Sequence, residues 1–280
     1  MEQKKIKISK NQVTQTESFD GNHWELWGVP IFGSGRHAVL KVVERWLGAS
    51  SLKLRKPKWL ATVNPEFMMI TAKDSRFFNI LQKTDLNVMD GIGLVWAREI
   101  QKKNLMLRKI IFGFQVGMEI LKGKYKDELA SGSDLMKDLC ELAAKKDYKV
   151  YFLGGWENRA ERTAKYFKNK YPKLNVVGAE SGGNLNPLSP KLRRAKPDIL
   201  FVAYGMKRQE EWIEKNLREL SIGLVMGVGR SFDYYSGELK RAPKLWRRMG
   251  FEWLYSLIRE PKRWRRQLEL PKFVWKVLTS

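Results

Sequence analysis

The sequence predicts an α/β fold: a parallel, Rossmann-like sheet covered by helices, followed by a basic, amphipathic, helical C-terminal appendage. Two observations carry this prediction. Short apolar segments typical of strands alternate with segments of helical periodicity, and several of the apolar segments end in glycine turns, as in sheets built from strand–helix–strand units. Beyond residue 237 the alternation stops, and basic residues are interleaved with tryptophans and leucines.

Residues 1–20 are polar, and we expect them to be flexible; residues 21–237 form the expected α/β domain. Its strands are apolar and bounded by turn residues. The expected strands are Leu26–Ile31, Trp59–Val63, Leu86–Met89, Lys149–Leu153, Asn175–Gly178, Asp198–Tyr204 and Gly223–Val228. The segments between them have helical periodicity. The expected helices are His37–Leu47, Glu66–Leu81, Ile92–Ile100, Leu135–Ala144, Glu157–Lys170 and Gln209–Leu217.

Residues 101–130 are basic and partly apolar, and their pattern assigns no definite element. The stretch Arg108–Lys124 combines apolar side chains with lysines and an arginine. It would suit an added membrane-facing or lid helix, and it would equally suit an ordinary surface insertion. Apolar positions within 91–121 also leave room for an interface between copies of the chain, so a homo-oligomer is possible.

The appendage, residues 238–280, is strongly basic. From position 240 onward, twelve Lys and Arg against three Glu give a net charge of +9. We expect two or three amphipathic helices separated at Pro243, Pro261 and Pro271. Tryptophans and leucines would enter a lipid headgroup boundary while basic residues face anionic lipid. Alternatively the appendage packs on the core, with Trp253, Leu254 and Leu257 facing inward.

The net charge of the whole chain is +23, from 53 Lys and Arg against 30 Asp and Glu. A surplus of this size favours an anionic partner (nucleic acid, anionic lipid or a phosphorylated substrate) over a basic surface kept only for solubility. Cys140 is the only cysteine and lies in an apolar-periodic stretch, which favours a buried, inert thiol. Two histidines and one cysteine provide no zinc-like cluster, so we expect no metal site and no cofactor. No apolar run approaches the roughly 20 residues that span a bilayer.

Glycine turns mark one edge of the predicted sheet. Gly154-Gly155 follows one strand and Gly227-Val228-Gly229 follows another. Backbone N–H groups at such positions can bind phosphate oxygens, since ligands of parallel sheets lie beyond the carboxyl ends of the strands. Neither turn is a complete dinucleotide fingerprint, so tight structural turns are an equally good interpretation.

Asp90 ends a predicted strand at the same edge, within Met89-Asp90-Gly91-Ile92-Gly93. A carboxylate among apolar residues and glycines can have a raised pKa and can accept a proton from a hydroxyl. Local sequence alone favours a simpler role, in which Asp90 caps the helix that follows. No Asp-x-Asp pair occurs in the chain, so a nucleotide diphosphate held through a metal on paired carboxylates is not indicated.

An ordered set of motifs resembles the WecG/TagA/CpsF family of glycosyltransferases from about Trp27 to about Lys276. The set comprises Thr62-Val63-Asn64-Pro65-Glu66, Asp90-Gly91-Ile92-Gly93, Gly132-Ser133-Asp134-Leu135, Leu153-Gly154-Gly155, Gln209-Glu210, Gly227–Asp233, Lys240-Arg241-Ala242-Pro243, Glu252–Tyr255 and Glu260–Arg263. The resemblance implies that residues 21–237 are a catalytic domain. It also implies inverting transfer of a sugar, N-acetylmannosamine or a relative, from a UDP-sugar to a polyprenyl-diphosphate-linked acceptor, without a catalytic metal.

The resemblance also assigns roles to residues. It implies that Asp90 is the general base. Residues implied to contact substrates are Thr62, Asn64, Gln209, Asp233, Arg263 and Arg266, with the glycine turn Gly154-Gly155 beside them. Arg263 and Arg266 would meet diphosphate. Ser256 stands where the family usually has an arginine, and Arg259, about one turn further on, would replace it. Arg230 stands where a glycine is usual.

The expected setting is the cytoplasmic face of the cell membrane, with the chain bound peripherally, in the synthesis of a cell-envelope or extracellular polysaccharide such as teichoic acid. The alternative is a nucleic-acid-binding protein, because basic residues with aromatics also suit phosphate contact and base stacking. No recognised nucleic-acid-binding motif occurs, and we expect no nucleic acid partner. A nicotinamide-dependent oxidoreductase is a further, weaker alternative.

Overall fold

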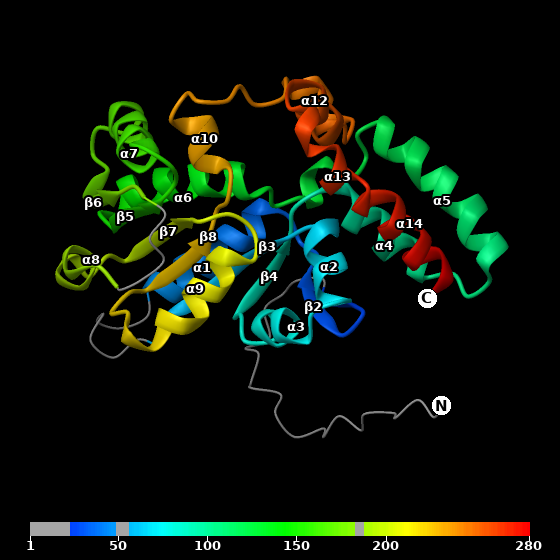
Figure 1. Ribbon diagram of the computed structural model, residues 1–280, viewed down its shortest axis with the longest axis horizontal. Helices are drawn as coiled ribbons and strands as arrows, with labels where there is room; N and C mark the ends of the chain where they lie inside the picture. The colour runs from blue at the N-terminus through cyan, green and yellow to red at the C-terminus, as the bar shows by residue number, and fades with distance from the viewer. Residues whose placement is uncertain (1–22, 49–55, 183–187) are drawn as a thin grey trace.

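The computed structural model describes residues 23–48, 56–182 and 188–280. Its centre is an eight-stranded sheet with the strand order β1-β2-β4-β3-β8-β7-β5-β6. Every neighbouring pair is parallel except the antiparallel β1–β2 pair. Helices cover the sheet and further helices follow it at the C-terminus (Figure 1), which confirms the predicted fold class. The expected flexible residues 1–20 lie outside the described residues.

The strands are β1 (His23–Leu26), β2 (Val29–Phe32), β3 (Lys58–Val63), β4 (Leu86–Met89), β5 (Lys149–Gly154), β6 (Asn175–Glu180), β7 (Ile199–Ala203) and β8 (Leu224–Gly227). The helices before the appendage are α1 (Arg36–Gly48), α2 (Pro65–Thr71), α3 (Ser75–Leu81), α4 (Ile92–Gln101), α5 (Met106–Leu121), α6 (Gly132–Lys146), α7 (Arg159–Lys170), α8 (Pro190–Ala195), α9 (Arg208–Asn216) and α10 (Ser231–Tyr235).

Two apolar cores lie on the two faces of the sheet. On one face α1, α6, α7 and α10 bury residues such as Leu139 and Phe232. On the other face α2, α3, α4 and α9 bury residues such as Met68 and Leu94. Because strands buried on both faces lack polar alternation, their sequences are continuous apolar runs, and this made most of them predictable.

Two expected elements are wrong in detail. The single strand expected at Leu26–Ile31 is the β1–β2 hairpin, which turns at Trp27 (φ 49°) and Gly28 (φ 84°). The single helix expected at Glu66–Leu81 is broken between α2 and α3. Asp74 caps α3 by accepting a hydrogen bond from Phe77 N at 3.0 Å, and a side chain that satisfies a free N–H group starts a new helix.

The appendage contains more helices than expected: α11 (Lys244–Arg248), α12 (Glu252–Arg259), α13 (Trp264–Gln267) and α14 (Glu269–Thr279), with a 3₁₀ turn at Pro261–Arg263. Pro271 does not separate helices. It lies in the first turn of α14, where a backbone N–H has no helical partner to lose. Within the described ranges, no helix combines the length and apolarity needed to span a bilayer.

The appendage both packs on the core and exposes aromatic side chains. Phe273 and Val277 of α14 are buried in the core that contains α2 and α4. Trp253 of α12 is 42% exposed, so the expectation that it faces inward is wrong. Leu254 and Leu257 are half-buried.

Candidate active site

The carboxyl ends of the strands gather the predicted site residues at one edge of the sheet. Asp90 directly follows β4, Asn64 follows β3, Gly154 ends β5 and Gly229 lies just after β8. Residues that ended separate segments of the sequence therefore meet where open α/β sheets bind ligands.

Asp90 lies between two elements that are distant in sequence. Its Oδ2 accepts a hydrogen bond from the backbone N–H of Gly132, at the start of α6, at 3.2 Å. A Cβ on Gly132 would lie 3.2 Å from Thr62 Oγ1 and 3.4 Å from Asp90 Oδ2, so Thr62, Gly132 and Asp90 are packed together. Helix α4 takes Gly91 as its N-cap without a side-chain hydrogen bond. The interpretation of Asp90 as a helix cap is therefore wrong.

The environment of Asp90 favours its protonated form. The residue keeps some exposure to solvent, but protein atoms surround its carboxyl group. Burial is the main cause that raises the pKa of Asp90 to about 7; the hydrogen bond from Gly132 opposes this, while the negative charge of Glu252 adds to it. A carboxylate with a pKa near neutrality is suited to accept a proton from a hydroxyl.

The two glycines that follow Asp90 have separate structural reasons. Gly91 has φ 110°, which a residue with a side chain rarely adopts. A Cβ on Gly93 would lie 2.7 Å from Pro65 Cγ, so this glycine lets α4 approach α2.

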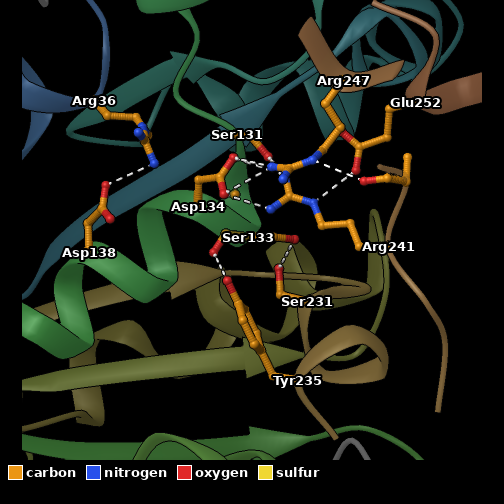
Figure 2. Close-up of polar contacts among 12 residues, drawn as sticks. Arg36, Ser131, Ser133, Asp134, Asp138, Ser231, Tyr235, Arg241, Arg247 and Glu252 are labelled. Carbon is orange, nitrogen blue, oxygen red and sulfur yellow. Dashed lines mark hydrogen bonds and ion pairs between the residues drawn. The ribbon is translucent and has the colours of Figure 1, made fainter. Parts of the chain in front are cut away.

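A charged cluster anchors the appendage to the start of α6 (Figure 2), the helix whose first residue, Gly132, donates to Asp90. Arg241 binds both carboxylate oxygens of Asp134, at 2.7 and 3.0 Å, and its Nε donates to Glu252 Oε1 at 3.0 Å. It also donates to Ser131 Oγ at 3.0 Å, while Arg247 approaches Asp134 at 3.4 Å. Burial alone would raise the pKa of Asp134, but the arginines outweigh it and hold that pKa below its ordinary value.

Asn64 and Thr62 have different surroundings. Asn64 caps α2, since its Oδ1 accepts from Phe67 N at 3.0 Å. Thr62 is only 7% exposed and lies against Gly132. Both lie at the same edge of the sheet as Asp90. Their contact with substrate stays a prediction.

The Gly154-Gly155 turn has a structural requirement for glycine. Both residues have positive φ, 98° and 78°. A Cβ on Gly154 would lie 2.9 Å from the carbonyl oxygen of Ala203, at the end of β7, to which Gly155 N donates at 2.8 Å. The structural interpretation therefore holds, and a role in nucleotide binding stays a prediction.

Gln209 is buried and supports the turn after β8. Its Oε1 accepts from Gly229 N at 2.9 Å, and its Nε2 donates to Glu210 Oε1 at 2.7 Å. Glu210 is fully buried, and burial raises its pKa to about 7. A Cβ on Gly227 would lie 2.6 Å from Gln209 Nε2, so the glycine is required for this packing.

Asp233 lies near the other end of the edge and pairs with a cation. Arg159 Nη1, at the start of α7, contacts its Oδ1 at 2.6 Å. Arg230, which stands where a glycine is usual, forms an ion pair with Glu260 after α12. The bulky cation therefore joins the appendage to the β8 turn.

The three arginines of the appendage that were predicted to meet diphosphate differ in their surroundings. Arg266 makes a bidentate ion pair with Glu66, at 2.7 and 2.8 Å, two residues beyond Asn64. Arg259 is an exposed residue of α12. The side chain of Arg263 lies outside the described part of the chain. Contact of these arginines with diphosphate stays a prediction.

Two features of this site had no predicted role, although both lie in the motifs quoted above. They are the Gly132 N–H that meets Asp90 and the Arg241–Asp134 pair, which joins positions 107 apart in sequence. Their presence in the ordered motif set was the only signal, since neither local pattern indicates a contact.

A hollow of about 550 Å³ lies elsewhere among the described residues, lined by Trp59, Trp212 and both basic and acidic side chains, including Arg76, Arg208, Glu211 and Glu214. It lies near the start of β3 and not at the carboxyl edge. The chemistry of Asp90 and the converging strand ends therefore identify the site better than cavity size does.

Comparison with known proteins shows the family of the chain. The family described as "Glycosyl transferase WecG/TagA/CpsF family" matches residues 24–121 and 111–280, in two pieces that overlap within α5. The chain belongs to this family. Membership makes it a glycosyltransferase and favours that interpretation over nucleic-acid binding.

Two curated relatives in this family have the same name, N-acetylglucosaminyldiphosphoundecaprenol N-acetyl-beta-D-mannosaminyltransferase. The protein from Bacillus subtilis (strain 168) is 29% identical over 221 residues, covering 78% of each chain. The protein from Bacillus spizizenii (strain ATCC 23059 / NRRL B-14472 / W23) is 31% identical over 234 residues, covering 83% of each chain.

Proposed function

We propose that this glycosyltransferase moves an N-acetylmannosamine-like sugar from a UDP-sugar to a polyprenyl-diphosphate-linked sugar, with inversion and without a catalytic metal. The single observation that carries the proposal is Asp90, a carboxylate with a pKa near 7 at the carboxyl edge of the sheet. The names of both relatives support the transferred sugar and the lipid-diphosphate acceptor.

Asp90 would act as the general base. Inversion requires one group that removes the proton of the acceptor hydroxyl while its oxygen attacks the anomeric carbon from the face opposite the leaving group. The hydrogen bond from Gly132 leaves the second oxygen of Asp90 for that hydroxyl. Its raised pKa matches the operating pH, which increases the driving force for proton transfer relative to an ordinary aspartate.

The leaving UDP gains negative charge as the sugar departs. The Gly154-Gly155 turn and the Gly229 region lie at the same edge as Asp90, and the lack of side chains there would let the phosphates approach the backbone. The N–H groups of Gly155 and Gly229 already donate to Ala203 O and Gln209 Oε1, so they would not be the phosphate donors. The tail arginines Arg259, Arg263 and Arg266 would add cationic hydrogen bonds, which can stabilise diphosphate without a metal. For Arg266 this requires that diphosphate replaces Glu66 as its partner. Glu66 lies two residues beyond Asn64, which is proposed to contact substrate.

The appendage would hold the enzyme peripherally at the cytoplasmic face of a membrane, where a polyprenyl-linked acceptor is found. Exposed tryptophans support this role, with Trp264 52% and Trp275 62% exposed beside a surplus of basic residues. Aromatic and basic side chains together suit the headgroup boundary of an anionic bilayer.

The proposal is tested by a donor screen. Purified full-length chain is incubated with radiolabelled UDP-N-acetylmannosamine, UDP-N-acetylglucosamine or UDP-glucose and a lipid-diphosphate-linked N-acetylglucosamine. We expect label to enter the lipid fraction from the first donor, with a β linkage in the product and no loss of rate in EDTA. Absence of transfer from every UDP-sugar would refute the proposed donor class.

A further inference from the structure

The outward face of α5 is apolar along its whole length. Its exposed side chains follow helical spacing, so they form one stripe. They are Leu107 (69% exposed), Ile110 (47%), Ile111 (55%), Phe114 (74%), Met118 (43%) and Leu121 (40%). A stripe of this kind, facing outward on a helix of a soluble domain, marks a surface that binds something.

The inward face of α5 fixes the helix firmly to the protein. Gly113 packs against Trp96 and Ile100 of α4, and its carbonyl oxygen accepts a hydrogen bond from Trp96 Nε1 at 3.0 Å. Lys109 is buried and donates to the carbonyl oxygen of Ser280 at 2.5 Å, beyond α14. The inward face also buries Val116 and Ile120, so α5 carries large apolar side chains on both its inward and its outward face.

Basic residues surround the apolar stripe. Without the inward-pointing Lys109, five Lys and Arg against one Glu between positions 102 and 124 give a net charge of +4. Arg108 on the helix and Lys122 just beyond it are exposed. Helix α14 lies beside α5 (Figure 1) and adds the exposed side chains of Val274 and Trp275. Apolar side chains in a basic surround complement an anionic lipid surface, which offers acyl chains beneath negative headgroups.

We propose that α5 is a membrane-inserting helix that lies in the headgroup boundary of an anionic bilayer, as a second contact besides the appendage. Its 16 residues span about 24 Å, enough to lie along the surface and too few to cross it. This inference deepens the proposed function and rests on it for the lipid-linked acceptor. Pairing of two α5 helices about a two-fold axis is disfavoured, because it would bring two surrounds of net charge +4 together.

Site-specific labelling tests the insertion directly. Cys140 is fully buried, and burial raises the pKa of its thiol, so an NBD probe reacts selectively with a cysteine introduced by Phe114→Cys. With vesicles of phosphatidylglycerol and phosphatidylcholine we expect the emission to shift to the blue and to be quenched by a nitroxide on the lipid acyl chain. A probe at Lys168→Cys, exposed on α7, is the matched control and should stay aqueous.

A binding measurement gives the contribution of the stripe at constant charge. The triple variant Ile111→Ser, Phe114→Ser, Met118→Ser should bind anionic vesicles roughly a hundredfold more weakly, because three apolar side chains no longer leave water. Its circular dichroism and melting temperature should match the wild type, since all three positions are exposed. Trp156→Ser, which removes an equally exposed tryptophan remote from α5, should leave vesicle binding unchanged.

Three outcomes would overturn the inference. The first is an NBD probe at Phe114→Cys whose emission stays that of a probe in water although the labelled protein co-sediments with vesicles. The second is a blue shift without vesicles that grows with protein concentration, which would make α5 an interface between copies. The third is unchanged vesicle binding by the triple variant. Sugar transfer to a short-chain, water-soluble acceptor without vesicles tests the proposed function separately from the membrane role of α5. We expect the triple variant to turn over this acceptor at the wild-type rate. Failure of the wild type itself would refute the transfer chemistry, and the labelling experiment would still decide the role of α5.

Discussion

Replacement of Asp90 by Asn should stabilise the protein above neutral pH while abolishing transfer. The pKa of Asp90 is about 7 in the folded chain against an ordinary value of 3.8. The fold therefore disfavours the ionised form, and wild-type stability falls as the pH rises from about 4 to about 7, because the unfolded chain releases this proton first. Asn carries no charge and keeps an oxygen that can accept from Gly132, so it avoids this loss.

The magnitude follows from the two pKa values. A difference of this size corresponds to about 4 kcal/mol of unfolding free energy above pH 7. Because Asp90 keeps partial contact with water, we expect a gain of about 2 to 4 kcal/mol for the variant at pH 8, and a rise of about 4 to 8 °C in melting temperature. The gain should shrink toward pH 5 and nearly vanish at pH 4.

Urea unfolding of wild type and Asp90→Asn at pH 5, 6, 7 and 8 measures this effect. Glu210, whose pKa is also about 7, is present in both proteins, so its contribution cancels in the difference. A variant that is less stable than wild type at pH 8, or a difference that is the same at pH 5 and pH 8, would refute the assigned environment of Asp90. In the wild type, kcat/KM should rise with pH up to about 7 and then level off; an ascending limb near pH 4 would contradict the same assignment.

Three further predictions follow from the site. Arg241→Ala leaves the charges of Asp134 and Glu252 uncompensated near Asp90, so the ascending limb of the pH–rate profile should move to higher pH. Arg247→Ala loses longer contacts to Asp134, at 3.4 and 3.5 Å, and a hydrogen bond to Ala242 O at 3.1 Å, so it should move this limb less. EDTA followed by dialysis should leave the transfer rate unchanged, and a rate restored only by added Mg²⁺ or Mn²⁺ would contradict diphosphate stabilisation by arginines. Cys140 is buried with a raised pKa, so it should not react with DTNB in the native protein and should react on addition of urea; rapid native labelling would disprove its burial.

Sequence patterns predicted the core of the fold because its strands are buried on both faces. Strand β4 at Leu86–Met89 was predicted with both boundaries correct, and β3 within one residue. The hairpin at Trp27 was missed because a tryptophan with positive φ carries none of the Asn-Gly signals typical of such turns. The break at Asp74 was missed because the apolar positions on both sides were assigned to one helix, although Asp74 within the polar stretch Lys73–Arg76 is a typical N-cap residue.

Sequence patterns predicted where Asp90 lies in the fold but not which residues it contacts. Asp90 could be placed at a strand end, but its neighbour Gly132 lies 42 positions away, and it is brought there by the segment before α6, in which Ala130 N donates to Met89 O of β4 at 2.9 Å. Without that contact the local pattern favoured a helix cap. Contacts made across the sheet edge depend on strand order, which no local periodicity encodes.

The Arg241 cluster connects the two parts of the proposed mechanism. The appendage that would bind the membrane supplies Arg241 and Glu252, and these meet Asp134 in the first turn of α6, two residues from the N–H group that binds Asp90. The same appendage contributes Glu252, whose charge helps to raise the pKa of the base. Charges of the appendage, Glu252 raising and Arg241 lowering the pKa of Asp90, thus tie the proton affinity of the base to the segment that would contact the lipid surface.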